Sequence, residues 1–363
     1  MIESDSGKYI LQKINKNVFK KPEEVMHNIR AVTTFIENKV IKTGGDPSKE
    51  ALHLKNTLDG TGFLIDDSGE YWRMYNYIEG AKTYNTIGSP EIFKKVGKAF
   101  GRFQIRLMDY QANTLYEAIP DFHNTPKRYA DFKQAVLIDK AGRLAEAKKH
   151  DEDPLIKAIN KLLACENEIG ILENGKKMGF FPIRITHNDT KVNNVMINET
   201  DTDKMCVIDL DTVGPDTALA DYGDAIRSGT NRAGEVAENY EDVSMDMELF
   251  KAYTEGYLDE ALVFDANGNL NIDPKKGLIK SEVEALHKAP RILTLELSMR
   301  FLGDYLNGDE YFKPKPGQPN DINLRRGLVQ LYLAEDMAHK EKKMESFIKE
   351  YIDRKKQSMT IKC

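Results

Sequence analysis

Cysteine is scarce in this chain of 363 residues, which contains only Cys165, Cys206 and Cys363. Three widely spaced cysteines argue against a disulfide framework, and without a closely spaced pair they argue against a structural zinc site. Long apolar runs are missing too, because no stretch approaches the roughly 20 residues that a membrane-spanning helix needs. The first ten residues are mixed polar, unlike a secretory signal. We therefore expect a cytoplasmic protein.

A dominant charge of one sign is also absent. The chain has 52 Lys and Arg against 58 Asp and Glu, which gives a formal net charge of −6 with both signs interspersed. This balance offers no electrostatic reason to expect binding to nucleic acid or to a membrane surface. The hydrophobic content of 40% and charged content of 30% are ordinary for a globular enzyme. The expected partner is therefore a small-molecule substrate.

The residues suited to chemistry gather in residues 185–211. Two short apolar runs rich in Ile and Val are typical of buried strands there. A buried carboxylate without a partner is costly, so carboxylates at the ends of such strands usually have a function. The polar residues within and beside the two runs are His187, Asp189, Asn194 and Asp209.

The spacing of these residues predicts a two-ligand metal site. A polar cluster separates the runs and predicts a hairpin. If the turn falls between Asp201 and Thr202, Asn194 faces Asp209 at about 5 Å, where their oxygens can share one Mg²⁺ ion. Asp189 lies in the preceding loop and can project toward the same point. Phosphoryl transfer needs such a loop carboxylate to orient the attacking hydroxyl and accept its proton.

The remaining pattern predicts an α+β protein with two lobes. Residues 1–80 predict a strand at 8–14, an amphipathic helix from Pro22 to Val40, and a strand–turn–strand unit at 62–78. Residues 81–363 are mostly helical and carry the 185–211 hairpin. Ser89 is a predicted N-cap with Pro90 at the first helical position. Further helices are expected at 126–149, 154–173, 216–228, 244–263, 281–306 and 319–353, with a small hairpin in 263–273.

The chain resembles a known superfamily through these residues. His187-x-Asp189-x₄-Asn194, followed by an apolar strand ending in Asp209, is similar to the catalytic signature of the aminoglycoside phosphotransferase and choline kinase superfamily. That superfamily has the bilobed protein-kinase-like fold, with a small sheet-bearing lobe and a large helical lobe. Further segments resemble the bacterial N-acetylhexosamine 1-kinases, which are sugar anomeric kinases. These segments are 9–12, 186–191, 207–212, 221–227, 252–257 and 299–312.

The resemblance implies an ATP- and Mg²⁺-dependent kinase that makes a sugar 1-phosphate from N-acetylglucosamine or N-acetylgalactosamine. It makes Asp189 the general base and makes Asn194 and Asp209 the Mg²⁺ ligands. His187 would hold the catalytic loop, with Asp221 as a further brace. Each residue alone has a plainer interpretation, such as a structural histidine, a loop cap or a turn-flanking pair.

The resemblance also implies where the two substrates bind. Tyr75, Asn76 and Tyr77 would form the hinge against which adenine lies. Arg300 and Tyr311 would contact the sugar. We expect a contribution from Asp304 as well, although Arg300 could instead pair with a carboxylate one helical turn earlier. Asp211 is expected either to contact the sugar or to support the residues that do.

The small lobe departs from the family pattern. In the family, a strand, a Gly-rich loop and a second strand precede the strand at 9–12, whereas only eight residues precede Tyr9 here. We expect either a chain that starts downstream of the true start or a protein that manages without the loop, with an exposed sheet edge. The phosphate-pairing lysine is also unidentified. Gln12 stands where many relatives have lysine, and Lys13 should point to the opposite face.

Two other functions stay open. The first is a kinase of another small alcohol, such as an aminoglycoside, choline or homoserine; a choline site would need an aromatic cage, and an aminoglycoside site a strongly acidic C-terminal lobe. The second is a binding protein of pseudokinase type that has lost its phosphate clamp. A calcium loop at 265–271 is disfavoured, because the segment lacks the required Gly and Glu positions.

Overall fold

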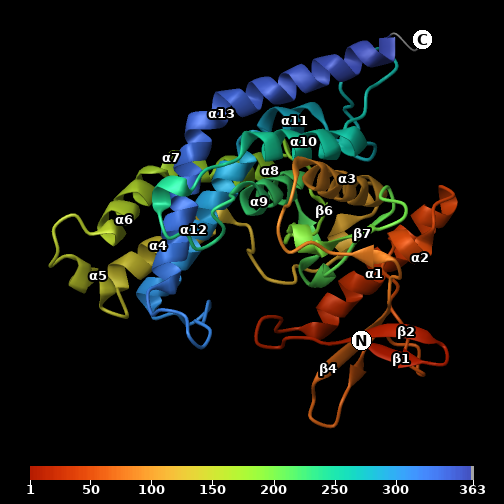
Figure 1. Ribbon diagram of the computed structural model, residues 1–363, viewed down its shortest axis with the longest axis horizontal. Helices are drawn as coiled ribbons and strands as arrows, with labels where there is room; N and C mark the ends of the chain where they lie inside the picture. Colours follow the sequence, from red (N-terminus) through yellow and green to blue (C-terminus); the bar gives the residue numbers. More distant parts are fainter. Residues whose placement is uncertain (361–363) are drawn as a thin grey trace. The chain divides into compact units, whose positions relative to one another are not determined.

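The computed structural model describes residues 1–360 (Figure 1), so Cys363 lies outside the described residues. None of the described helices is long and apolar enough to cross a membrane. The chain forms two compact units. The first unit comprises Met1–Phe122, Ile183–Asp221 and Ala252–Lys280; the second comprises His123–Pro182, Tyr222–Lys251 and Ser281–Cys363. The expected division into lobes of residues 1–80 and 81–363 stays a prediction.

The first unit begins with a four-stranded antiparallel sheet of order β1-β2-β4-β3. Its strands are β1 (Ile2–Ser4), β2 (Gly7–Lys13), β3 (Leu64–Ile65) and β4 (Tyr71–Asn76). The expected strand at 8–14 is therefore confirmed, whereas the sequence did not predict β1, which lies at the edge of the sheet. In the β2–β4 register, Gln12 lies opposite Arg73 and Ile10 opposite Tyr75. Directly opposed side chains share a face, so these four side chains lie on one side of the sheet.

Helix α1 (Pro22–Lys42) supplies the core of this region. Its apolar positions recur at helical spacing, as the sequence predicts, and Val25, Ile29 and Val32 are at most 1% exposed. They share one hydrophobic core with Ile14 and Tyr75. A short helix, α2 (Pro47–Glu50), follows, capped by the Asp46 carboxylate, which accepts from Ser48 N.

Two further sheets in the first unit carry the 185–211 region. One is the pair β6 (Arg184–Thr186) and β9 (Gly214–Asp216). The other has the order β5-β7-β8, built from β5 (Ala81–Lys82), β7 (Val195–Asn198) and β8 (Met205–Val207). Helix α3 (Pro90–Leu107) begins at the predicted N-cap, where Ser89 Oγ accepts from Ile92 N at 3.4 Å. Its apolar face joins the core that contains Ile185 and Cys206.

Glycine allows α3 to approach α10 (Met247–Ala261) closely. A Cβ atom added at Gly97 would lie 2.3 Å from the carbonyl oxygen of Tyr253, and one at Gly256 would lie 2.0 Å from that of Lys94. No side chain larger than hydrogen fits between the two backbones at those points. This contact helps to hold α3 in its place against β6, β7 and β8.

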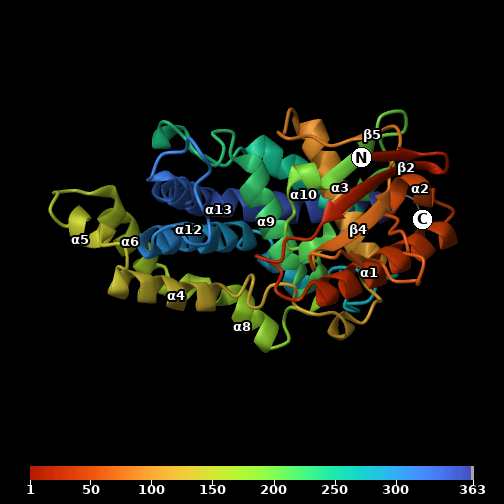
Figure 2. The ribbon, with the colours of Figure 1, turned by 90° about the horizontal axis from the view of Figure 1, so that it is seen from below.

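The second unit is helical. Figure 2 shows α12 (Ala289–Asn307) and α13 (Ile322–Thr360) side by side, with α4 (Thr125–Ile138) also against α12. Its core gathers around Phe132, Leu162, Met299 and Leu302. The other helices are α5 (Arg143–Ala147), α6 (Pro154–Ala164), α7 (Glu166–Ile169), α8 (Ile171–Lys177) and α11 (Lys280–Ala285), and α9 (Ala218–Thr230) begins in the first unit. Short 3₁₀ turns occupy Ala112–Thr114, Val192–Asn194, Leu210–Thr212 and Tyr240–Asp242.

Three of the expected helices are broken in the structure. The expected helix at 126–149 ends at Ile138, because Asp139 adopts a left-handed conformation with φ of 45°. The Asp139 carboxylate then accepts from Leu144 N at 3.0 Å and Ala145 N at 2.8 Å, which starts α5. The expected helices at 154–173 and 281–306 are likewise divided, at Cys165 and Gly170 and before Ala289. Hydrophobic periodicity continues across such breaks, so it does not reveal them.

Candidate active site

His187 braces the loop between β6 and β7. The ring is fully buried, and its Nε2 lies 2.8 Å from the carbonyl oxygen of Ile208 while its Nδ1 accepts from the Asp189 N–H at 3.2 Å. A carbonyl oxygen can only accept, so Nε2 carries the proton and the imidazole is fixed in one tautomer. Both ring nitrogens are therefore engaged, and His187 holds the loop in place.

Asp221 holds the same loop through its backbone. One carboxylate oxygen accepts from His187 N at 2.8 Å and the other from Asn188 N at 2.7 Å. Gln104 on α3 donates to Ile185 O at 2.8 Å and lies 3.4 Å from the Asp221 carboxylate. The expected bracing position of Asp221 thus has a geometric basis, because these bonds support Asn188 in a left-handed conformation with φ of 64°.

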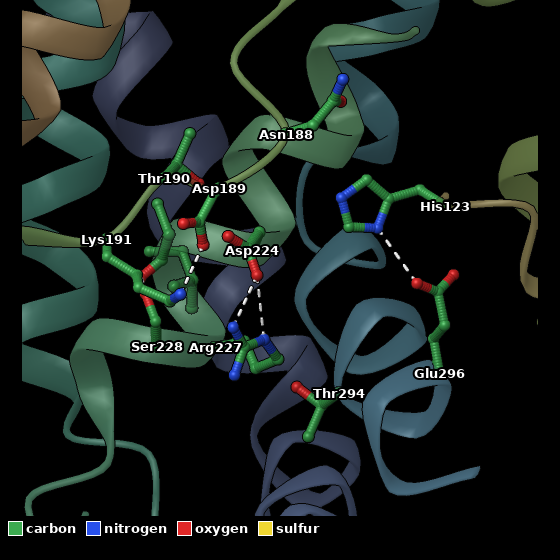
Figure 3. A network of polar contacts seen from close by, with 12 residues as sticks. His123, Asn188, Asp189, Thr190, Lys191, Asp224, Arg227, Ser228, Thr294 and Glu296 are labelled. Atoms are coloured by element: carbon green, nitrogen blue, oxygen red, sulfur yellow. Dashed lines mark hydrogen bonds and ion pairs between the residues drawn. The ribbon is translucent and has the colours of Figure 1, made fainter. Parts of the chain in front are cut away.

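Asp189 projects from this loop with 30% of its side chain exposed. The Lys191 ammonium lies 2.7 Å from its Oδ1, an ion pair marked in Figure 3. Lys191 was not among the residues predicted from the sequence, although its place two residues after Asp189 within the motif was a usable signal. The loop thus presents one carboxylate and one cation together.

Asn194 points its amide nitrogen at Asp189. Nδ2 donates to the Asp189 carbonyl oxygen at 2.7 Å and lies 3.3 Å from the Asp189 carboxylate. Since a carbonyl oxygen accepts only, this contact fixes which end of the amide is nitrogen. Within residues 1–360, no hydrogen-bond donor approaches Oδ1 of Asn194. That oxygen is therefore available to a cation.

The predicted register of the hairpin is wrong by one residue. Val195 pairs with Val207 and Ile197 with Met205, and Ile208 N donates to Asn194 O at 2.9 Å. Asn194 therefore lies opposite Ile208, and the turn centres on Asp201. The shift agrees with the turn contacts: Asn198 N donates to Lys204 O, and Asn198 Oδ1 accepts from Thr200 N and Asp201 N, so the turn is centred on a residue instead of on the bond between Asp201 and Thr202.

Asp209 reaches the site by backbone conformation instead of strand pairing. Because β8 ends at Val207, Asp209 lies outside the strand. It adopts φ of 60° and ψ of 59° at the start of the following 3₁₀ turn. Burial and the neighbouring carboxylates of Asp211 and Asp189 raise the pKa of Asp209, while His187 and Arg73 oppose the rise. A cation at this position would relieve that repulsion.

The donor set fits Mg²⁺. Oxygen atoms of one carboxylate and one amide, Asp209 and Asn194, are the type of ligand that Mg²⁺ accepts, with its other positions taken by water and phosphate. In the described part of the chain, no cluster of three or more His, Cys, Asp or Glu side chains could hold a metal by itself. The site therefore suits an ion that arrives with a phosphorylated substrate.

Arg73 is a buried cation on the sheet face that carries Gln12. Its Nε and Nη2 donate to Gln12 Oε1 at 3.2 and 3.1 Å, and its Nη1 forms an ion pair with Oδ1 of Asp211. Lys13 instead pairs with Glu70 at 3.0 Å, which agrees with its predicted placement on the other face. Arg73 was not predicted from the sequence as a site residue, although an arginine at a core-facing position of a strand was a signal.

Two of the three expected hinge residues, Tyr75 and Asn76, belong to strand β4. Tyr75 is 4% exposed and lies within β4. Asn76 N donates to His53 O and Tyr77 N to Lys8 O, both at 3.0 Å. In residues 1–360, the N–H groups of Ile78 and Glu79 have no protein acceptor, so the free backbone donors follow the three expected residues.

The expected sugar-contacting residues lie in the second unit. The Arg300 guanidinium lies over the rings of Tyr311 and Phe312, at 5.7 and 5.5 Å from their centroids. The Asp304 carboxylate accepts from Tyr311 N at 2.9 Å and from Phe312 N at 2.8 Å. Asp304 thus holds the backbone that carries the two aromatic rings, while Tyr311 is itself 56% exposed.

A cation-rich cluster surrounds Arg300 within the second unit. Burial lowers the pKa of Arg300, as do the charges of Arg128 and Arg227, while Glu296 opposes them. Glu296 accepts from His123 at 3.0 Å and from Thr125 at 2.7 Å, and Asp224 accepts from Arg227 at 2.6 Å. Figure 3 shows the His123–Glu296 and Asp224–Arg227 contacts. The expected Arg300–Glu296 attraction is present, but His123 and Thr125 supply the hydrogen bonds.

Comparison with known proteins identifies the family and supports the fold. Residues 2–258 match the phosphotransferase enzyme family. The fold is similar to the crystal structure of an aminoglycoside phosphotransferase from Alicyclobacillus acidocaldarius subsp. acidocaldarius DSM 446, with 12% identity and a TM-score of 0.58 over 97% of this chain and 89% of that chain. It is also similar to a microcompartment-associated aminopropanol kinase, with 11% identity and a TM-score of 0.56 over 94% and 88% of the two chains. At such identities the likeness concerns the fold.

Proposed function

Since the chain belongs to the phosphotransferase enzyme family, whose kinases phosphorylate alcohol groups, we propose that its acceptor is the anomeric hydroxyl of an N-acetylhexosamine. The γ-phosphoryl group of ATP would pass to N-acetylglucosamine or N-acetylgalactosamine, giving ADP and the sugar 1-phosphate. The observation that carries the reaction type is the Asn194–Asp189 contact, which places a free amide oxygen beside the candidate base.

Asp189 is proposed as the general base. Its carboxylate would accept the proton of the sugar hydroxyl while orienting that oxygen for attack on the phosphorus atom. The bond between the γ-phosphorus and the bridging oxygen breaks as the new bond to the sugar oxygen forms, and ADP leaves with the electron pair. Lys191, paired with Asp189 at 2.7 Å, is placed to offset negative charge at this carboxylate and on an incoming phosphoryl group.

Asn194 and Asp209 are proposed to hold Mg²⁺ together with the phosphates of ATP. When bound, the ion would neutralise charge on the phosphate oxygens. The protein contributes fixed ligands, because Asn194 is oriented by Asp189 and because Ile208, next to Asp209, is held by the His187 ring. Adenine is proposed to lie against residues 75–79, where the N–H groups of Ile78 and Glu79 can donate to it.

The second unit supports a neutral sugar as the acceptor. Arg300 has two further arginines, Arg128 and Arg227, close enough to lower its pKa. These arginine charges favour an acceptor without ammonium groups over aminoglycosides and choline, with Glu296 and Asp224 offsetting part of the repulsion that a further positive charge would meet. Guanidinium groups instead donate to carbonyl and hydroxyl oxygens, which an acetamido sugar provides. The exposed ring of Tyr311 offers an apolar face for the sugar ring.

A panel of acceptors tests the proposal. ADP release is measured with N-acetylglucosamine, N-acetylgalactosamine, unacetylated hexoses, choline, homoserine and an aminoglycoside, each at the same concentration with ATP and Mg²⁺. We expect turnover with the N-acetylhexosamines, and we expect Arg300→Met to raise their KM more than it lowers kcat. Turnover only with the amines would contradict the substrate assignment. No turnover with any acceptor would favour a binding protein over an enzyme.

A further inference from the structure

An ion pair in the first unit joins β4 to the segment that follows Asp209. The side chain of Arg73 is 3% exposed and that of Asp211 is 20% exposed, and the two form an ion pair. Gln12, opposite on β2, accepts from the other edge of the same guanidinium. The guanidinium also lies 5.3 Å from the centroid of the Tyr75 ring. Arg73 is thus held on three sides and has little freedom to move.

This contact fixes the segment that carries Asp209. Asp211 lies two residues after Asp209 within the 3₁₀ turn Leu210–Thr212. Leu210 is 1% exposed in the core, and Thr212 Oγ1 donates to His187 O at 2.7 Å. The turn therefore has three anchors, namely the core, the catalytic loop and Arg73. Arg73 is the anchor that comes from the four-stranded sheet.

Helix α1 supplies no acidic partner for Arg73. In protein kinases, the cation of the small sheet is paired by a glutamate of the neighbouring helix. In this chain the buried face of α1 presents apolar residues together with the neutral polar residues Asn28 and Thr33. Its three glutamates are engaged elsewhere, since Glu23 contacts Tyr71, Glu24 contacts Lys21 and Glu37 contacts His53. The sheet cation is therefore coupled directly to the turn beside the candidate metal ligand.

We propose that Arg73 is a positioning residue that holds Asp209 in its metal-binding conformation through Asp211. The inference rests on the proposed function, because it takes Asp209 as a metal ligand. The left-handed backbone of Asp209 is unfavourable for a residue with a side chain, so it needs support from its surroundings. Arg73 gives that support from the sheet, and a metal–nucleotide complex that binds Asp209 orders the sheet in return.

The sign of the effect separates positioning from simple electrostatics. If Arg73 acted only as a charge, its removal would take a positive charge away from a cation site, and the metal would bind more tightly. If Arg73 positions Asp209, its removal releases the turn and the metal binds more weakly. Supporting residues around metal ligands typically change affinity by roughly 10–100-fold.

The test measures the dissociation constant of Mn²⁺ by electron paramagnetic resonance, with ADP present at a fixed saturating concentration. Arg73→Met, Asp211→Asn and the double variant are compared with the wild type. We expect each single change to raise the constant by about 10-fold or more. We expect the dissociation constant of the double variant to be no higher than that of the single variant that binds Mn²⁺ more weakly, because both changes break the same contact.

A matched control distinguishes positioning from general damage. Arg106 forms another, partly buried ion pair in the first unit, with Glu50 at 2.5 Å and side chains 15% and 9% exposed. Arg106→Met should lower the melting temperature without changing the Mn²⁺ constant. Hydrogen exchange should show that Mn²⁺ with ADP protects β4 in the wild type but not in Arg73→Met.

The outcomes are distinct. Unchanged or tighter Mn²⁺ binding in Arg73→Met would overturn the inference, and so would an equal loss in Arg106→Met. Should Arg73→Met not fold, Asp211→Asn keeps the side-chain size, and unchanged Mn²⁺ binding in that variant would overturn the inference equally. Absence of Mn²⁺ and ADP binding in the wild type would contradict the proposed function itself.

Discussion

The amide nitrogen of Asn194 donates to the backbone carbonyl oxygen of Asp189, with the two atoms 2.7 Å apart. This bond has two consequences. It turns the other end of the Asn194 amide, its oxygen, away from the loop, and it ties the candidate base to a candidate metal ligand. A substitution at either residue therefore affects the other, and metal binding and base position should be tested separately.

Asp209→Asn tests the metal site. Loss of the carboxylate should lower kcat by roughly 10²–10³-fold, the range seen when one electrostatic partner of a transition state is removed. The activity that remains should need a higher Mg²⁺ concentration, measured by titrating Mg²⁺ at constant ATP. Asp203→Asn is a suitable control, because Asp203 lies on the exposed turn of the same hairpin with its side chain 75% exposed. An unchanged Mg²⁺ requirement in Asp209→Asn would argue against metal ligation.

Asp221→Asn tests the brace of the loop between β6 and β7. The Asp221 carboxylate is 1% exposed and accepts from the N–H groups of His187 and Asn188. An amide would direct an NH₂ group at one of these donors and remove a buried charge-assisted hydrogen bond. The free energy of unfolding should fall by about 1.5–3 kcal/mol, measured by urea denaturation, and kcat should fall as well. A variant as stable as the wild type would show that the loop is held in another way.

Glu296 should make the stability of the protein depend on pH. Burial alone would raise the pKa of this carboxyl, but His123, Arg300 and Thr125 outweigh burial and hold it below the ordinary value of 4.5. A carboxyl with a lowered pKa stabilises the folded state above its unfolded pKa, and that contribution is lost as the pH falls through the folded value. The wild type should therefore lose its stability advantage over Glu296→Gln as the pH drops below about 4.5. Urea unfolding of both proteins between neutral and acidic pH measures the difference, and a constant difference would contradict the assignment.

Cys206 should be inert in the folded protein. The side chain is 1% exposed, and burial raises its pKa to about 12, so the reactive thiolate is scarce at neutral pH. Labelling with iodoacetamide followed by peptide mass mapping should modify Cys206 only after unfolding. Cys165 is partly exposed and serves as the internal comparison, since it should react first. Equal labelling rates for Cys165 and Cys206 in the folded protein would show that the β7–β8 hairpin opens readily.

The sequence predicts the helices and strands of this fold better than it predicts where they end and how they pair. The α1 and α3 periodicities and the Ser89 cap are local signals, and the structure agrees with them. The helix break at Asp139 depends on a single left-handed residue, and the hairpin register depends on the Asn198 side chain. Both are decided by individual hydrogen bonds that apolar patterning does not encode.

The candidate site shows the same difference between local features, which the sequence predicts, and long-range contacts, which it does not. The motif brings His187, Asp189 and Asn194 together because the three lie in one short loop. Asp209 reaches its position by a backbone turn instead of the expected cross-strand pairing. Arg73 lies more than a hundred residues from its partner Asp211 in the chain, and the two meet only in the folded structure, where they form an ion pair. Long-range ion pairs of this kind require the three-dimensional structure.

The central claim is phosphoryl transfer to an anomeric hydroxyl with Asp189 as base. The most direct measurement is phosphorus NMR of a reaction containing ATP, Mg²⁺ and N-acetylglucosamine or N-acetylgalactosamine, with the wild type and with Asp189→Asn. With the wild type, we predict the resonance of a sugar 1-phosphate, coupled to the anomeric proton, together with ADP. With Asp189→Asn, we predict that its rate of formation falls by roughly 10²–10⁴-fold, while the KM for the sugar stays nearly unchanged. A phosphorylated product formed at the wild-type rate by Asp189→Asn, or a phosphate on any other hydroxyl, would contradict the account.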